Sequence, residues 1–123
     1  MELKDIANTL VEGCKTGQAK ANLDKLYASD AVSVEAADMG SGREVQGLDA
    51  IKGKHDWWDN SFEVLDANIT GPMLHGDDKF GVIFKMKAKN RASGEVSDME
   101  EIAVYHVGNG KITREEFFYT PSE

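Results

Sequence analysis

The sequence predicts an α+β fold for residues 1–123, taken as one domain, in which a curved antiparallel β-sheet carries three N-terminal-half helices on its concave face. Two patterns predict this class. Before residue 60, apolar residues recur every three or four positions in three stretches, which is the spacing of amphipathic helices. After residue 62 they alternate with polar residues between turn sequences, which indicates antiparallel strands.

The three helices are predicted over residues 2–16, 19–28 and 48–59. The apolar positions of the first helix fall on one stripe: Leu3, Ile6, Ala7, Leu10, Val11 and Cys14. The second helix buries Leu23, Leu26 and Tyr27, and the third carries Leu48, Ile51, His55 and Trp58 on one face. These apolar faces are expected to pack against the sheet.

Alternation with a period of two predicts the strands. It begins in DAVSVEA, residues 30–36, and the glycine-rich segment DMGSGREVQG that follows is expected to be plain loop. Turns are predicted in HGDDK, at Ser93-Gly94 and at Asn109-Gly110, a dipeptide that suits the positive φ angles of a type I′ turn. Residues 62–119 therefore form four antiparallel strands. The clearest of them, KFGVIFKMKAK, directs these residues toward the core: Phe80, Val82, Phe84, Met86 and Ala88.

Composition excludes several classes of partner. The net charge of −8 repels nucleic acid and anionic membranes, and no apolar run approaches the ~20 residues that span a bilayer. The lone Cys14 is expected to be a small buried hydrophobe, in keeping with a reducing compartment. No two histidines have metal-ligand spacing. A cytoplasmic protein without metal or cofactor is expected.

Four segments of the chain resemble a known family in their order and spacing. They are LYASDAVSVEA, GLDAIKGKHDWW, GPMLHGDDKFGVIFKMKA and MEEIAVYHVGNGKITREEFFY, and the chain they cover is similar to SnoaL-like members of the nuclear transport factor 2-like superfamily. The resemblance implies a cone-shaped, cystatin-like fold, usually dimeric, with a pocket between the helices and the concave sheet. Steroid isomerases, polyketide cyclases, epoxide hydrolases, dehydratases and non-catalytic binding modules share this fold, which therefore does not select the function.

The last hairpin places charges among apolar residues. Counting outward from a two-residue turn at Asn109-Gly110, Tyr105 faces Arg114 and Ala103 faces Glu116. The same count from Ser93-Gly94 sets Met86 opposite Glu101 and Phe84 opposite Ala103. Glu101, Arg114 and Glu116 would then stand together on the more apolar, concave face.

Such a Glu–Arg–Glu group offers acid–base chemistry, because apolar surroundings raise the pKa of one carboxylate while the arginine lowers that of the other. Limonene epoxide hydrolases of the superfamily are similar in kind, with an Asp–Arg–Asp group. The alternative is an ion-pair network without chemistry, inside the cone or in a dimer contact. One bulge would also reverse the faces and bring Glu100 and Glu115 inward.

Glu35 is a second candidate for acid–base chemistry, because it lies five residues after Asp30 in YASDAVSVEA. Ketosteroid isomerases place their general base at that spacing. Their two oxyanion donors would fall at about Val11 and near Ile102 or Ala103, where this chain has apolar residues. Steroid isomerisation of that type is therefore not expected, and Glu35 could equally be a polar residue at a strand end.

An aromatic group suits a small, largely apolar organic ligand. The candidate ligand-binding residues are Tyr27, His55, Trp58, Phe84, Tyr105 and Phe118. Packing of Trp58 between helix and sheet, and a hydrogen-bonded His55, are the alternatives.

Three functions stay open: a small-molecule isomerase, cyclase, dehydratase or hydrolase, a binding protein with the same pocket, or a structural dimer. A homodimer is expected in each case, because four large apolar residues fall on the otherwise polar sheet face: Ile83, Ile102, Val104 and Phe117.

Overall fold

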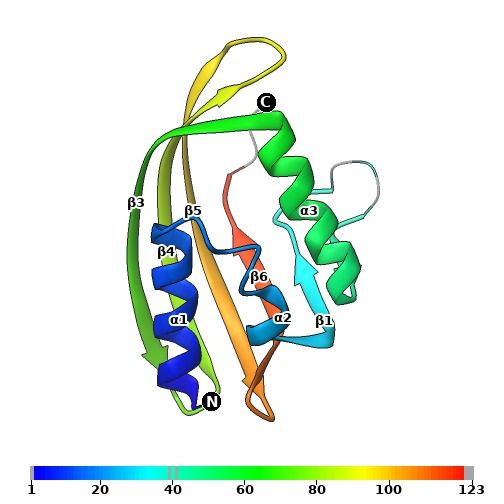
Figure 1. Ribbon diagram of the computed structural model, residues 1–123, viewed down its shortest axis with the longest axis vertical. Coiled ribbons are helices and arrows are strands. Elements are labelled where there is room, and N and C mark those ends of the chain that lie inside the picture. The colour runs from blue at the N-terminus through cyan, green and yellow to red at the C-terminus, as the bar shows by residue number, and fades with distance from the viewer. Residues whose placement is uncertain (1, 39, 41, 121–123) are drawn as a thin grey trace.

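A computed structural model describes residues 2–38, 40 and 42–120. Along the chain the elements are α1 (Leu3–Lys15), α2 (Leu23–Leu26), β1 (Tyr27–Val34), β2 (Glu44–Gln46), α3 (Leu48–Ser61), β3 (Phe62–His75), β4 (Lys79–Asn90), β5 (Val96–Gly108) and β6 (Lys111–Phe118). The six strands form one curved sheet in the order β2-β1-β6-β5-β4-β3. The predicted α+β architecture, with the helices on one side of the sheet, is confirmed (Figure 1).

The helices cover the concave side of the sheet. In Figure 1, α1 lies over β3 and β4, and α3 lies over β1. The predicted stripe of α1 is confirmed, with Ile6, Ala7, Leu10 and Val11 buried. The second helix is much shorter than predicted, because Tyr27 already has extended backbone and begins β1. No helix in the described part of the chain is long and apolar enough to cross a membrane.

The sheet is mixed, which corrects the expectation of a wholly antiparallel sheet. Strands β3 to β6 are antiparallel neighbours as predicted, but β1 pairs with β6 in parallel. Both strands leave the same end of the sheet, since α2 delivers β1 beside the turn that starts β6 (Figure 1). The segment predicted as plain loop contains β2, a short strand that pairs antiparallel with β1.

The hydrophobic core lies between the helices and the inward face of the sheet. The predicted alternation of β4 is confirmed, with Phe80, Val82, Phe84 and Ala88 buried and Met86 partly buried. The rest of this core comes from the other strands and from the helices: Tyr27, Ala31, Ala103, Tyr105 and Ile112 from β1, β5 and β6, and Ile6, Ala7, Leu10, Val11, Leu23, Leu26 and Ile51 from the helices.

The register of the last hairpin differs from the predicted one. The turn is as predicted, with Asn109 at φ 52° and Gly110 at φ 75°, and Val107 faces Ile112. Thr113 is then an extra residue on β6 without a partner on β5, so that Tyr105 faces Glu115 rather than Arg114. This bulge reverses which residues of β6 point inward.

The register between β4 and β5 also shifts, but without changing faces. Five residues, 91–95, join these strands in place of a two-residue turn. Phe84 therefore faces Glu101 and Met86 faces Met99. A shift of two residues leaves every side chain on its predicted face, so Glu101 still points inward beside Ala103 and Tyr105.

Candidate functional site

A buried carboxylate, Glu115, occupies the inward face of β6. Its side chain is only 3% exposed. The Tyr27 hydroxyl donates a hydrogen bond to Oε1, and Ser33 Oγ donates one to Oε2 at 2.6 Å. Both donors come from β1, because parallel pairing sets Ser33 directly beside Glu115. These charge-assisted hydrogen bonds compensate the cost of burying the carboxylate.

Lys54 of α3 joins this buried group to more exposed residues. Its ammonium donates to Ser33 Oγ at 2.7 Å and forms an ion pair with Glu35 Oε1 at 2.5 Å. The Tyr119 hydroxyl donates to Glu35 Oε2 at 3.0 Å. Polar contacts thus run without interruption from Glu115 through Ser33 and Lys54 to Glu35 and Tyr119.

Glu101 differs from the other inward carboxylates because no residue in the described part of the chain hydrogen-bonds to it or forms an ion pair with it. Burial raises its pKa to about 7, and the negative charges of Glu35 and Glu115 add to that rise, while Lys54 opposes it. A carboxyl group with a pKa near neutrality can both accept and give a proton under physiological conditions.

The remaining ionisable groups of the interior are held uncharged. Burial raises the pKa of Tyr27 and Tyr105 well above 10, and the Glu115 charge adds to both shifts. Burial also raises the pKa of the Cys14 thiol to about 11 and lowers the pKa of His55. A protonated thiol is a poor nucleophile, so Cys14 serves as a small hydrophobe packed against the core.

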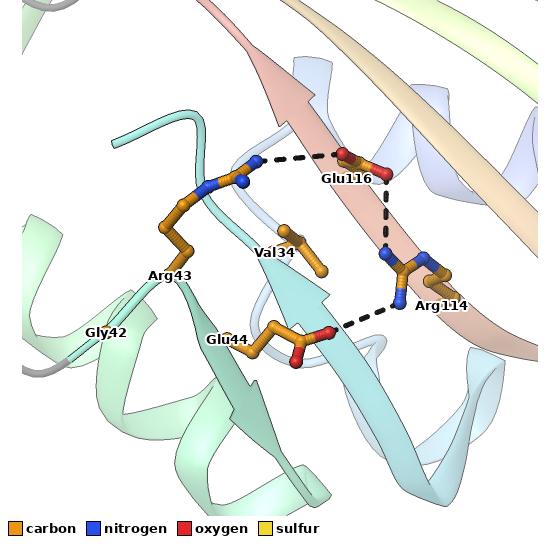
Figure 2. A pocket seen from close by; sticks show the side chains of 6 residues that line it. All are labelled: Val34, Gly42, Arg43, Glu44, Arg114 and Glu116. Atoms are coloured by element: carbon orange, nitrogen blue, oxygen red, sulfur yellow. Dashed lines mark hydrogen bonds and ion pairs between the residues drawn. The ribbon is translucent and has the colours of Figure 1, made fainter. Parts of the chain in front are cut away.

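The predicted Glu101–Arg114–Glu116 group is not formed, because the bulge at Thr113 turns Arg114 and Glu116 to the outer face. Figure 2 shows them in an open pocket of about 480 Å³ with Val34, Gly42, Arg43 and Glu44. Glu116 pairs with Arg43 at 3.9 Å and with Arg114 at 3.4 Å, and Arg114 pairs with Glu44 at 3.4 Å. Long, partly exposed ion pairs of this kind contribute about 0–1 kcal/mol each to stability.

The predicted reversal of faces is half right. Glu115 points inward as the bulge interpretation requires, but Glu100 stays outward and exposed, because the bulge affects β6 and not β5. Phe118 is also turned outward and is 47% exposed, which corrects its predicted place in the pocket. Phe117 takes the inward position and packs against the core, with the Lys54 ammonium 5.3 Å from its ring centroid.

The other predicted ligand-binding residues lie on the inward side or at its border. Tyr27, Phe84 and Tyr105 are buried, and His55 is partly buried on α3. Trp58 stacks on Phe62 with ring centroids 4.6 Å apart, so its packing role at the end of α3 is evident. Glu35 lies just past β1, 28% exposed and paired with Lys54.

Sequence reasoning missed Ser33 and Lys54. Lys54 lies three residues after Ile51 and four before Trp58, both on the helix face that was predicted to point inward, so the sequence held a signal for Lys54. Ser33 had none, because only the parallel pairing of β1 with β6 brings it to Glu115. Within the described residues, no group of three or more histidine, cysteine, aspartate or glutamate side chains is placed to hold a metal ion.

Comparison with known proteins supports the same fold. A family model described as a SnoaL-like domain matches residues 1–119. A candidate SnoaL-like polyketide cyclase from Mesorhizobium loti, also described as a carbohydrate phosphatase, is 35% identical with a TM-score of 0.89, over 97% of this chain and 100% of that one. No curated protein matches the chain significantly.

More distant structures show the fold alone. A Xanthomonas campestris protein of unknown function with a cystatin-like fold is 16% identical with a TM-score of 0.75, over 98% of this chain and 92% of that one. A hypothetical Catenulispora acidiphila protein with a ketosteroid isomerase-like fold, solved with trimethylamine, is 19% identical with a TM-score of 0.71, over 91% and 83%.

Proposed function

The chain belongs to the family of SnoaL-like domains, and from this premise we propose that the concave side of its sheet binds a small, largely apolar organic molecule and that Glu101 exchanges a proton with it. The observation that carries the proposal is the position of Glu101. It is an inward carboxyl group without a partner in the described part of the chain, with Phe84 opposite and the buried Ala103 beside it. Purely structural carboxylates in such places are paired, as Glu115 is.

The chemistry that suits this arrangement is proton transfer at carbon. The Glu101 carboxylate removes a proton from a carbon adjacent to a carbonyl group, and the electron pair moves to the carbonyl oxygen to form an enolate. Return of the proton to another carbon is an isomerisation, and attack of the enolate on a second carbonyl is a cyclisation. The pKa of Glu101 near 7 allows it to act in both directions.

A second candidate is ligand binding without chemistry. It is favoured by the polar network of Glu115, Ser33, Lys54 and Glu35. These residues hydrogen-bond or pair with one another and would support the concave side without taking part in a reaction. In that case Glu101 serves as a hydrogen-bonding group for the ligand.

Exchange of the α-protons of 2-tetralone in D2O, followed by ¹H NMR, tests the proposal. This bicyclic ketone is apolar, uncharged and enolisable. The protein is expected to accelerate exchange, and Glu101→Gln is expected to reduce the acceleration at least 100-fold, since a positioned general base contributes about 10²–10⁴-fold. Glu100→Gln is the matched control, because Glu100 is the adjacent residue on the exposed outer face.

The result separates the two functions. If 2-tetralone binds and its exchange is no faster than with Glu101→Gln, the protein is a binding module. If neither binding nor exchange is detected, the proposed ligand class is wrong.

A further inference from the structure

Tyr105 is a buried tyrosine whose hydroxyl has no partner in the described part of the chain. The side chain is 3% exposed, and its ring stacks on Phe80 with centroids 4.8 Å apart and planes at 15°. The described residues contain no polar side-chain atom that is both sealed from solvent and unpartnered. The Tyr105 hydroxyl is therefore not completely sealed by protein atoms.

Tyr27 provides the contrast. It is also buried and on the same inward side, but its hydroxyl donates to Glu115. Buried tyrosine hydroxyls usually find such a partner, and one that opens onto space without a protein partner is available to a ligand. The ring of Tyr105 is held by its stack on Phe80, so the direction of the hydroxyl is set before any ligand arrives.

Charged groups already described lie near Tyr105. The negative charges of Glu115 and Glu101 both raise the pKa of its hydroxyl. Glu101 and Tyr105 point to the same face of β5, four residues or about 13 Å apart along the strand, on the concave side where side chains converge.

We propose that Tyr105 donates the hydrogen bond that holds the carbonyl oxygen of the ligand, so that the ligand is a neutral carbonyl compound whose apolar body extends from Tyr105 toward Glu101. This inference rests on the proposed function. It assigns a hydrogen-bond donor for the carbonyl oxygen to a chain that has apolar residues at the positions of the ketosteroid isomerase oxyanion donors. When Glu101 removes a proton from a carbon adjacent to or conjugated with the carbonyl, the negative charge that develops on the oxygen strengthens the hydrogen bond from Tyr105.

The charges around the space define the ligand class further. Burial and the neighbouring carboxylates keep Tyr105 protonated, so it acts as a donor to oxygen over the physiological pH range. The same carboxylates disfavour a ligand that carries its own carboxylate or phosphate group, because the only interior cation among the described residues, Lys54, is paired with Glu35. A ketone or ester is expected to bind more tightly than the corresponding acid.

Titration of the protein with 2-tetralone and with tetralin, the same bicyclic skeleton without the carbonyl, tests the inference. Tyr105→Phe is expected to weaken 2-tetralone binding about 10-fold, and tetralin binding less than about 2-fold, because one hydrogen bond is lost and the apolar contacts stay. The ¹³C resonance of a labelled carbonyl should move downfield in the wild-type complex and not in Tyr105→Phe. Tyr119→Phe is the matched control, since it removes a hydroxyl that binds Glu35.

The outcomes distinguish this inference from the proposed function. Equal affinities of wild type and Tyr105→Phe for 2-tetralone, with no carbonyl shift, would overturn the role of Tyr105 while binding and the Glu101-dependent exchange persist. Tyr105-dependent binding without Glu101-dependent exchange would support the inference and overturn the proton transfer. A wild-type protein that binds neither probe would contradict both.

Discussion

Two buried tyrosines, Tyr27 and Tyr105, are expected to differ in how much their hydroxyl groups stabilise the protein. Tyr27→Phe leaves one oxygen of the buried Glu115 without its donor. The free energy of unfolding should fall by about 1–3 kcal/mol, the cost of an unsatisfied buried charge-assisted hydrogen bond. Tyr105→Phe should change it by less than about 0.5 kcal/mol, because no described residue loses a partner. Urea denaturation of both variants measures the difference, and equal losses would contradict the assigned network.

Glu101 should make stability depend on pH. Its pKa is about 7 in the folded protein, against an ordinary value of 4.5 for a glutamate side chain. Between these values the folded state keeps a proton that the unfolded state has released, so the unfolding free energy falls as pH rises and levels off above about 7. The loss between pH 5 and pH 8 is about 2–3 kcal/mol, and it should be absent in Glu101→Gln.

Chemical denaturation of wild type and Glu101→Gln at both pH values measures this difference directly. Glu100→Gln should keep the wild-type pH dependence, because its carboxylate is exposed. Glu101→Gln leaves Arg114 with both of its partners, since Arg114 pairs with Glu44 and Glu116 on the other face. If the unfolding free energy of Glu101→Gln depends on pH as that of wild type does, Glu101 is solvated in the folded protein.

At the scale of the element, the bulge in β6 decides which charges enter the interior. Deleting Thr113 would remove the bulge, but it would keep Arg114 opposite His106 and Glu115 opposite Tyr105, because Ile112 already faces Val107. Glu115 would therefore keep its place beside Tyr27 and Ser33. The deletion variant is expected to keep the cooperative thermal transition seen by circular dichroism.

Thr113→Ala is the matched control for the deletion. It keeps the backbone of the bulge and removes a hydrogen bond of 3.3 Å to the His106 carbonyl oxygen, made by an exposed side chain. Its cost should be below about 1 kcal/mol. Loss of the cooperative transition in the deletion variant would mean that β6 does not keep this register without the bulge.

The whole molecule presents an apolar area on the outer face of the sheet. Ile102 and Phe118 face each other across β5 and β6 and are 46% and 47% exposed, with Ile83 and Val104 beside them. Phe118 thus takes the place that was predicted for Phe117. We propose that two copies of the chain pair through this face, since exposed apolar groups of this size mark contact surfaces.

Sedimentation velocity tests this dimer. Ile102→Lys should convert a dimer into a monomer at about 10 µM, because a charge in the middle of a standard-size interface is left unpaired. Val96→Lys, at the 48% exposed start of β5, should stay dimeric. A wild-type protein that sediments as a monomer at tens of micromolar would refute the proposal.

Local patterns in the sequence determined the element types of this protein, apart from β2, whose segment was predicted to be loop. The stripe of α1, the inward residues of β4 and the Asn109-Gly110 turn were all predicted, because each depends on neighbours within a few positions and on the 3.6- or two-residue period of the chain. Glu101 was placed on the inward face for the same reason. The family resemblance, carried by four such segments in order, was confirmed with them.

Tertiary structure alone decided the site around Glu101. Alternation predicts that a strand has two faces. One extra residue, Thr113, reverses which residues of β6 point inward from that position onward. The position of this bulge reflects the stability gained when Glu115 rather than Arg114 meets Tyr27 and Ser33. The parallel pairing of β1 with β6 joins residues more than eighty positions apart, beyond the reach of any local pattern. Whether Tyr105 keeps a free hydroxyl depends on what packs around it, and that is a property of the folded interior.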